Sequence, residues 1–269
     1  MMAGNLEIPP LKARRMARCK SILHRVQPVG SIALFFMLWE LAARLQWINP
    51  RFVPPPSQVF ASLVVMLQNG MLVEDTVASV QRSLAGFFLG SLVAILLGLL
   101  TGHTAWCRRL FEPIIQLFRP IPSIAFVPLA TLWFGLGETP KVFLIAYGAF
   151  FPVWLNTHVG VGTVDRDYLR AARCLGANAR QIFFGIVLPA ALPFIVAGLR
   201  FGIGVAFIVL VAAEMTGASA GLGYRIEQSH LVFRPDQMLV GLLMLGILGA
   251  VADWVFHKIT SKTLLFWVN

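Results

Sequence analysis

One stretch of the sequence has the spacing of a catalytic serine. Residues 217–221 read Gly-Ala-Ser-Ala-Gly, which matches the G-x-S-x-G turn that presents the nucleophile of serine hydrolases. The general base would have to be His230 or His257. Whether Ser219 can react therefore depends on the elements that carry these three residues.

Four polar residues in otherwise apolar stretches are the other candidates for chemistry. They are Arg119, Asn156, Arg200 and Glu214. An ionisable group in apolar surroundings is expensive to bury, so such residues are functional candidates by default. Arg119 and Arg200 would supply a positive field suited to a small oxyanion. The alternative is that they form structural ties with Glu112, Glu214 or a backbone carbonyl.

Cofactor chemistry has no support in the sequence. The phosphate-binding pattern G-x-x-x-x-G-K-[ST] does not occur, so the chain cannot bind ATP by that route. The three cysteines, Cys19, Cys107 and Cys174, have neither metal-ligand nor disulfide spacing. We expect no catalytic residue, no metal and no cofactor in this chain.

The composition indicates a membrane protein. Hydrophobic residues make up 58% of the 269 residues and charged residues 13%, and the mean hydropathy is +0.77. A soluble domain of this length needs a polar surface that such a composition cannot supply. The net charge of +10 does not predict a nucleic-acid partner, because the basic residues lie in the N-terminal tail and in short loops. In those places they fit anionic lipid headgroups better.

Six apolar stretches are long enough for membrane-spanning helices. They are Val29–Leu45, Leu84–Thr101, Ile114–Phe134, Val142–Val161, Leu192–Ala213 and Met238–Phe256. The first contains Glu40 and Arg44, which are four residues apart and can pair on one helix face. The third contains Pro120, Pro122 and Pro128, which must break or kink it, so we expect it inside the bundle. Close helix packing is predicted at the G-x-x-x-G pairs Gly86/Gly90, Gly98/Gly102 and Gly198/Gly202.

The distribution of Lys and Arg predicts the orientation of the chain. With a cytoplasmic N-terminus, fourteen basic residues fall inside and five outside. Because cytoplasmic segments carry the excess of basic residues, both termini are expected inside, and all three cysteines lie in the reducing cytoplasm. The expected parts are a basic cytoplasmic tail at 1–28, a transmembrane domain at 29–258 and a cytoplasmic C-terminal tail at 259–269.

This topology argues against a catalytic role for Ser219. Ser219 falls in an external loop, and His257 lies near the opposite membrane face, about 25–30 Å away along a straight helix. Small residues in a loop are the better explanation of the pattern. An intramembrane serine protease therefore remains only a remote alternative.

The cytoplasmic segment 162–188 carries a further pattern. Residues from Asp165 to Leu175 predict a short helix with acidic residues at its N-terminal end, where the helix dipole favours them. Gly176 is placed to end this helix in a left-handed conformation, and Asn178 to cap a second helix that runs into Pro189. An ordinary amphipathic loop is the alternative. The pattern predicts a helix–turn–helix elbow at the inner membrane face.

The elbow resembles the EAA loop of ABC importer permeases. That signature reads E-A-A, three residues, Gly, nine residues and I-x-L-P. Here Ala171-Ala172, Gly176 and the run that ends in Leu188-Pro189 match it, and Arg170 replaces the glutamate. Permeases for nitrate, taurine, aliphatic sulfonates and bicarbonate are also similar at residues 38–41, 53–57, 117–125, 132–137, 213–215 and 221–224.

This resemblance implies an all-α type I importer permease fold, similar to the methionine permease, in a bacterial inner membrane. Two copies of the chain would form the pathway, with two ATP-binding cassette subunits inside that hold ATP and Mg²⁺, and a substrate-binding protein outside. The loop at about 162–188 would be the coupling element. Its implied coupling residues are Arg170, Ala171, Ala172, Gly176, Leu188 and Pro189. Nitrate, sulfonates, taurine, bicarbonate and heterocyclic solutes stay open as substrates.

An ATP-independent secondary transporter or channel is the main alternative. Such transporters are typically built from inverted repeats, or carry a cluster of acidic proton-relay residues at mid-membrane. Neither is evident in this sequence. A stable complex with a soluble ATPase would separate the two hypotheses.

Overall fold

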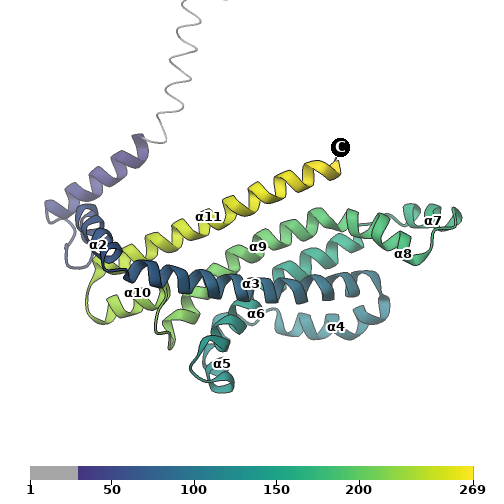
Figure 1. The fold of residues 1–269 in the computed structure, drawn as a ribbon, viewed down its shortest axis with the longest axis horizontal. Helices are drawn as coiled ribbons and strands as arrows, with labels where there is room; N and C mark the ends of the chain where they lie inside the picture. The colour runs from purple at the N-terminus through teal and green to yellow at the C-terminus, as the bar shows by residue number, and fades with distance from the viewer. Residues whose placement is uncertain (1–29, 269) are drawn as a thin grey trace, which may run out of the picture. The chain divides into compact units, whose positions relative to one another are not determined.

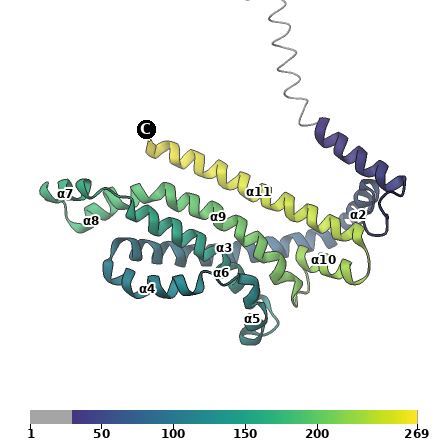
Figure 2. The same cartoon turned by 180° about the vertical axis from the view of Figure 1, so that it is seen from behind.

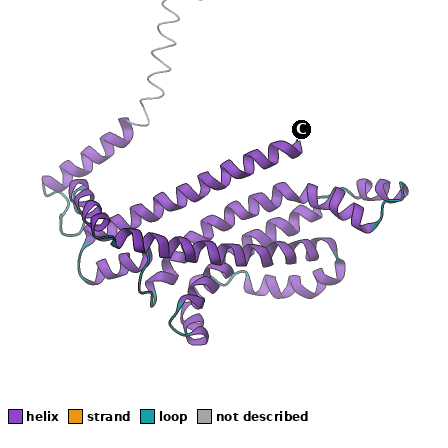
Figure 3. Ribbon diagram, viewed as in Figure 1, coloured by secondary structure: helices purple, strands orange, loops and turns teal. Residues whose placement is uncertain are grey.

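The computed structural model describes residues 30–268, and every regular element in this part of the chain is a helix (Figure 1, Figure 3). The expected basic tail at 1–28, which includes Cys19, lies outside the described residues. The chain divides into two units, of which the first ends at Ala61 and the second begins at Ser62.

The first unit contains a helix over residues 30–44, within the first expected span. The carboxylate of Glu40 accepts a hydrogen bond from Arg44 Nε at 2.7 Å, which confirms the expected pairing. It also accepts bonds from the backbone N–H and the hydroxyl of Ser57, at 3.1 and 2.9 Å. These bonds connect the helix to the start of α2, Pro56–Gln68, which is not among the expected spans.

The second unit contains four helices that are long and apolar enough to cross a membrane, and a bent pair that makes a fifth candidate. The four are α3, Met71–His103; α6, Glu138–Gly162; α9, Leu188–Met215; and α11, Pro235–Val268. Each contains one of the expected spans, and α11 continues past the expected end of the transmembrane domain at residue 258. The described part of the first expected span, residues 30–44, is helical but too short to test a full crossing, so a count of six spans stays a prediction.

The third expected span is a helix pair bent by 85°. Pro120 and Pro122 lie in the break between the two helices, where no intrahelical N–H is needed, and Pro128 lies in the first turn of the second helix, where proline fits. The predicted kink is thereby confirmed. The elements are α4, Ala105–Phe118; the 3-10 turn η1, Ser123–Phe126; and α5, Val127–Phe134.

This bent segment lies at the surface of the single chain, and not inside the bundle as we expected. Its exposed side chains include Leu117, Leu132 and Trp133, although Val127 and Ala130 are buried. Irregular backbone at membrane depth needs protein or a water-filled cavity around it. At membrane depth, the exposed side of the break would need such surroundings from outside this chain.

Helix α6 packs closely against both α3 and α9 (Figure 1, Figure 2). A Cβ atom at Gly90 of α3 would collide with the backbone of Ala146 in α6. A Cβ atom at Gly198 of α9 would lie 2.8 Å from Cβ of Asn156, also in α6. The remaining glycines of the G-x-x-x-G pairs face similar contacts, so the predicted close packing is confirmed.

The helices of the second unit place the expected cytoplasmic segments together. The α3–α4 turn, the C-terminal end of α11, and the short helices α7, Arg166–Cys174, and α8, Ala179–Ile182, lie at one end of α3, α6 and α9 (Figure 1, Figure 2). Helix α10, Leu222–Leu231, lies at the other end. The segments expected inside and the segment expected outside therefore lie at opposite ends of the long helices, as the predicted topology requires (Figure 1).

Candidate functional site

The elbow begins with a capped helix. Asp165 is the N-cap of α7, and its side chain accepts a bond from the backbone N–H of Asp167 at 2.9 Å. The helix ends at Cys174 and is followed by Leu175 and by Gly176, which has a φ of +84°. The backbone N–H of Ala177 donates to the carbonyl of Ala172 at 3.0 Å, the long bond of a Schellman motif. The left-handed end predicted at Gly176 is confirmed.

The second arm of the elbow leads directly into the membrane. Asn178 and Gln181 form a capping box with two bonds of 2.9 Å, as the position of Asn178 predicts. A π-helical turn, Phe183–Val187, follows and joins α9. Pro189 lies at the start of α9 and has no N–H to donate. The wider turn before it accommodates the proline ring without ending the helix.

The surface of the elbow is part apolar and part basic. Leu175 at its tip is 88% exposed and Ala171 is also exposed. Ala172 instead packs against the apolar cluster that includes Val161 and Ile182, so it holds α7 on the rest of the chain. Within the described residues Arg170, which replaces the glutamate of the signature, pairs only with the exposed Asp167, at 3.1 Å. Such an exposed pair contributes little to stability.

Of the other signature residues, Leu188 and Pro189 are half-buried at the start of α9. Leu188 packs against the same cluster as Ala172. The elbow is therefore fixed to the membrane helices through its apolar side, while Ala171 and Leu175 remain free to contact another protein.

Arg119 is the first of the four polar candidates in the spans. It follows the last residue of α4 and is exposed at the break between α4 and α5. Within the described residues its guanidinium has no ion pair or side-chain hydrogen bond, and neither Glu112 nor Glu214 pairs with it. Its charge remains available at the bend.

Asn156 and Arg200 both have partners within the spans. The amide of Asn156 donates to the carbonyl of Pro152, one turn earlier in α6, at 2.8 Å. Arg200 binds the carboxylate of Asp253 with two parallel bonds of 2.8 and 2.9 Å. This bidentate pair links α9 to α11. The sequence had suggested a structural tie for Arg200 with Glu112, Glu214 or a backbone carbonyl, but its partner is Asp253.

Glu214 is fully buried and belongs to a group of polar residues near the start of α10. It accepts bonds from the hydroxyl of Ser79 at 2.8 and 2.9 Å, from Arg82 Nη1 at 2.8 Å and from the backbone N–H of Gly223 at 2.8 Å. Arg82 also donates to the carbonyl of Ala220 at 2.6 Å. The carboxylate is thus completely enclosed by donors.

Further charged residues extend this group. Arg82 bonds to both carboxylate oxygens of Glu138, which in turn accepts a bond from Lys141 at 3.1 Å. Asp75 accepts bonds from the backbone N–H of Gly221 at 2.9 Å and from Arg225 Nε at 2.7 Å. We call the set the polar network; it consists of Asp75, Ser79, Arg82, Glu138, Lys141, Glu214 and Arg225.

Sequence reasoning found only Glu214 of this network. A signal for three other members was present, since Asp75, Ser79 and Arg82 recur at intervals of four and three residues and so share one face of α3. The predicted span began only at Leu84, so these residues were treated as part of a loop. The structure places them in the first turns of α3.

The serine motif is part of the loop that closes over the polar network. Gly221 has a φ of +130°, and a Cβ atom there would lie 2.5 Å from Glu214 Oε1, so the second glycine of the motif is needed for packing. Ser219 is exposed. His257 lies 22 residues into α11, about 33 Å from its start. This position does not support His257 as the general base of Ser219.

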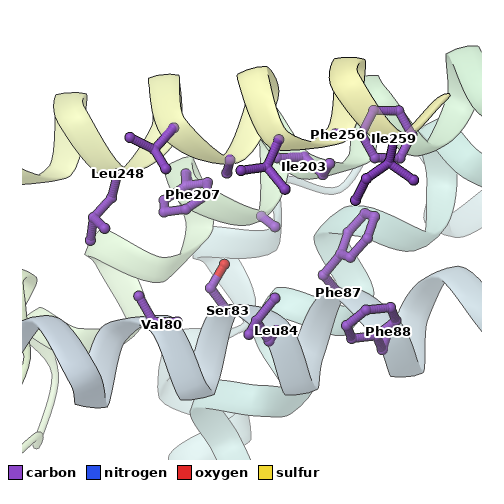
Figure 4. Close-up of a pocket in the computed structure, with 14 residues that line it drawn as sticks. Val80, Ser83, Leu84, Phe87, Phe88, Ile203, Phe207, Leu248, Phe256 and Ile259 are labelled. Carbon is purple, nitrogen blue, oxygen red and sulfur yellow. The ribbon is translucent and has the colours of Figure 1, made fainter. Parts of the chain in front are cut away.

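The described residues offer no metal site, and the best-formed cavity does not suit an anion. No group of three or more His, Cys, Asp or Glu residues in the described part could hold a metal ion. A cavity of about 310 Å³ between α3, α9 and α11 is lined by apolar side chains apart from Ser83 (Figure 4). An anion would find no cation there.

Comparisons with known proteins identify the family. The family model of the binding-protein-dependent transport system inner membrane component matches residues 86–264. The taurine transport system permease protein of Escherichia coli is 36% identical over 230 residues, which cover 84% of each chain. The nitrate import permease protein of Synechocystis is 30% identical over 255 residues, which cover 90% of this chain and 92% of that protein.

Solved structures give the same answer for the fold. An inward-facing structure of the MetNI methionine ABC transporter contains a chain that matches with a TM-score of 0.61 at 21% identity. The match covers 71% of this chain and 95% of that chain. The two chains share a fold, as the resemblance of the elbow implied. The chain therefore belongs to the family of inner membrane components of binding-protein-dependent transport systems, and within it to the ABC transporter permeases.

Proposed function

We propose that this chain is the transmembrane subunit of an ATP-driven importer that carries a small anion delivered by a substrate-binding protein. The observation that carries the proposal is the elbow: a capped helix, a left-handed glycine and a second capped helix continuous with α9, in a member of this permease family. The anion belongs to the nitrate, sulfonate, taurine or bicarbonate class. The relatives named for taurine and nitrate support that range without choosing within it.

The elbow couples the chain to a cytoplasmic ATPase subunit in this proposal. Ala171 and Leu175 contact the ATPase, Gly176 sets the angle of the helix that carries them, and Ala172 holds it on the membrane domain. Leu188 and Pro189 pass the movement on to α9. Arg170 contributes a positive charge where the family signature has a negative one. ATP and Mg²⁺ belong to the two ATPase subunits, and this chain does no chemistry of its own.

A second copy of the chain completes the pathway. The exposed side of the bend between α4 and α5 needs protein or water around it at membrane depth, and a homodimer with a central pathway supplies both. Arg119 at this bend is the proposed pathway cation. Asn156, Arg200 and Glu214 are proposed as structural residues, because each is engaged by partners within the chain.

The proposed location is the bacterial inner membrane, with six spans and both termini in the cytoplasm. The chain consists of the basic tail at 1–28, the transmembrane domain at 29–258 and the C-terminal tail at 259–269. Its proposed partners are the lipid bilayer, the ATPase subunits and the external binding protein. Nucleic acid is not among them. The excess of basic residues in the expected inner segments supports this orientation.

The test is reconstitution with the partner ATPase and binding protein. ATP hydrolysis in proteoliposomes is measured while the binding protein is loaded in turn with nitrate, taurine, an alkanesulfonate or bicarbonate. Stimulation by one of these anions supports the proposal and identifies the substrate. A chain that transports without any ATPase subunit would instead be a secondary transporter or channel, and the proposal would fail.

A further inference from the structure

The polar network joins four elements at the α10 end of the second unit. Arg82 of α3 lies at its centre and reaches Glu138 in the first turn of α6 and Glu214 in the last turn of α9. Helix α10 is attached through Gly221, Leu222 and Gly223, whose backbone N–H groups donate to Asp75, Ser79 and Glu214.

The two carboxylates that bind Arg82 differ strongly in exposure. The side chain of Glu214 is 0% exposed, whereas that of Glu138 is 58% exposed. Breaking the bond to Glu214 would leave this buried carboxylate without a cationic partner, which is very costly. Breaking the bond to Glu138 would return that carboxylate to water. Only one of the two ion pairs can open easily.

The charges of the polar network would remain paired after the bond between Arg82 and Glu138 breaks. Its three acidic and three basic residues form three neutral pairs: Arg82 with Glu214, Glu138 with Lys141, and Asp75 with Arg225. Glu138 and Lys141 are three residues apart on α6 and would move together. Separation of the first turn of α6 from α3 would therefore leave no charge in this network without a partner.

The chain near Glu138 has the features of a movable joint. α6 begins at Glu138, directly after Gly135-Leu136-Gly137, and Gly135 has a φ of +76°. These residues connect α6 to the bent segment α4–α5. Beside the ion pair lies an open cavity of about 300 Å³, lined by Ala78, Gln81, Arg82, Ala85, Glu138 and Val142. Water in this cavity can solvate the separated groups.

We propose that Glu138 is a positioning residue of the transport cycle, and that its ion pair with Arg82 holds the first turn of α6 against α3 in one state and opens in the other, while the glycine contacts farther along the two helices stay closed. The bond between Arg82 and Glu214 stays closed throughout and keeps α10 on α3 and α9. The inference rests on the proposed function, because it assigns the movement to the transport cycle of an ATP-driven permease. Beyond that function, the inference identifies one ion pair that opens during the cycle, and this pair lies at the end of the helices opposite the elbow.

The experiment measures the approach of α3 and α6 by thiol cross-linking. In the full complex, with Cys19, Cys107 and Cys174 replaced by serine, Ala78→Cys and Val142→Cys place one thiol on each side of the cavity. A short bifunctional thiol reagent reports how often the two helices are close. The pair is combined with Glu138→Gln, with Glu138→Asp and with Glu74→Gln, an exposed acid of α3 outside the network. The cross-linking rate of the parent cysteine pair and of each variant is measured without nucleotide and after trapping with ATP, Mg²⁺ and vanadate.

Without nucleotide, Glu138→Gln should lower the cross-linking rate about two- to five-fold, the range for one solvent-accessible ion pair. Glu138→Asp should restore most of the rate, Glu74→Gln should leave it unchanged, and vanadate trapping should lower it in the parent protein. Equal rates for the parent and Glu138→Gln would overturn the proposal. So would a Glu138→Gln chain that does not fold, since Glu214 is assigned the structural role. Loss of the ATPase from the parent complex would instead contradict the proposed function, and the comparison without nucleotide would still test the ion pair.

Discussion

The left-handed turn at Gly176 allows a quantitative test of the coupling loop. Its φ of +84° is a conformation that costs an L-residue about 1–2 kcal/mol. No heavy atom lies within 4 Å of a Cβ added there, so steric contact contributes nothing and the backbone strain is the whole cost. We expect Gly176→Ala to destabilise the observed conformation of the elbow by about 1–2 kcal/mol, Gly176→Asn by less and Gly176→Val by more. Since Gly176 is exposed and outside the spans, all three variants should insert normally.

Two measurements in the same membranes test this order: co-purification of the ATPase subunit and substrate uptake. Gly185→Ala is the matched control, because Gly185 lies in the same elbow with open space around it but without a positive φ. It should behave as the parent protein. Wild-type binding and uptake in Gly176→Val would refute the coupling role of the turn. Equal losses in the Asn, Ala and Val variants would refute the argument from backbone strain.

Three further predictions follow from the same structure. A membrane-impermeant thiol reagent applied to intact cells should leave Cys174, which is exposed in the elbow, and Cys107 unmodified; strong labelling of Cys174 from outside would reverse the proposed topology. Arg119→Glu should abolish uptake in an assembled complex while Arg119→Lys keeps part of it, and normal uptake by Arg119→Ala would exclude a pathway role. Glu214→Ala should destabilise the chain by about 3–5 kcal/mol, because it leaves the buried Arg82 with the exposed Glu138 as its acidic partner; a thermal unfolding curve of the purified protein that matches the parent would contradict this.

The elbow could be predicted from the sequence because its determinants are local. Asp165 caps the helix through the N–H two residues later, and Asn178 exchanges bonds with Gln181 three residues later. The left-handed end depends on Gly176 alone. Interactions over such short separations leave a readable pattern of residue types. The kink in the third span was predictable for the same reason, since proline acts on its own helix.

The polar network could not be predicted, because its bonds join residues that are far apart in sequence. Arg82 and Glu214 are separated by 132 residues, and Asp75 and Arg225 by 150. A single sequence carries no signal for such a pair. Hydropathy also misplaced the start of α3, since Asp75 and Arg82 lower the apolar character of turns that are nevertheless helical. Their charge is compatible with a buried position only because partners from α9 and α10 neutralise it.

The ion pairs in the structure also distinguish the cations that are neutralised from a cation that could attract an anion. Arg200 was a candidate equal to Arg119 from sequence, but Asp253 binds its guanidinium in a bidentate pair, so the two together carry no net charge. Arg82 and Lys141 are neutralised within the polar network. Arg119 differs in having no acidic partner in the described part of the chain, and it lies at the exposed bend between α4 and α5. Two copies of the chain that meet at this bend would bring two such charges to one pathway. In the proposed function, the attraction of a small anion therefore depends on Arg119 rather than on Arg200.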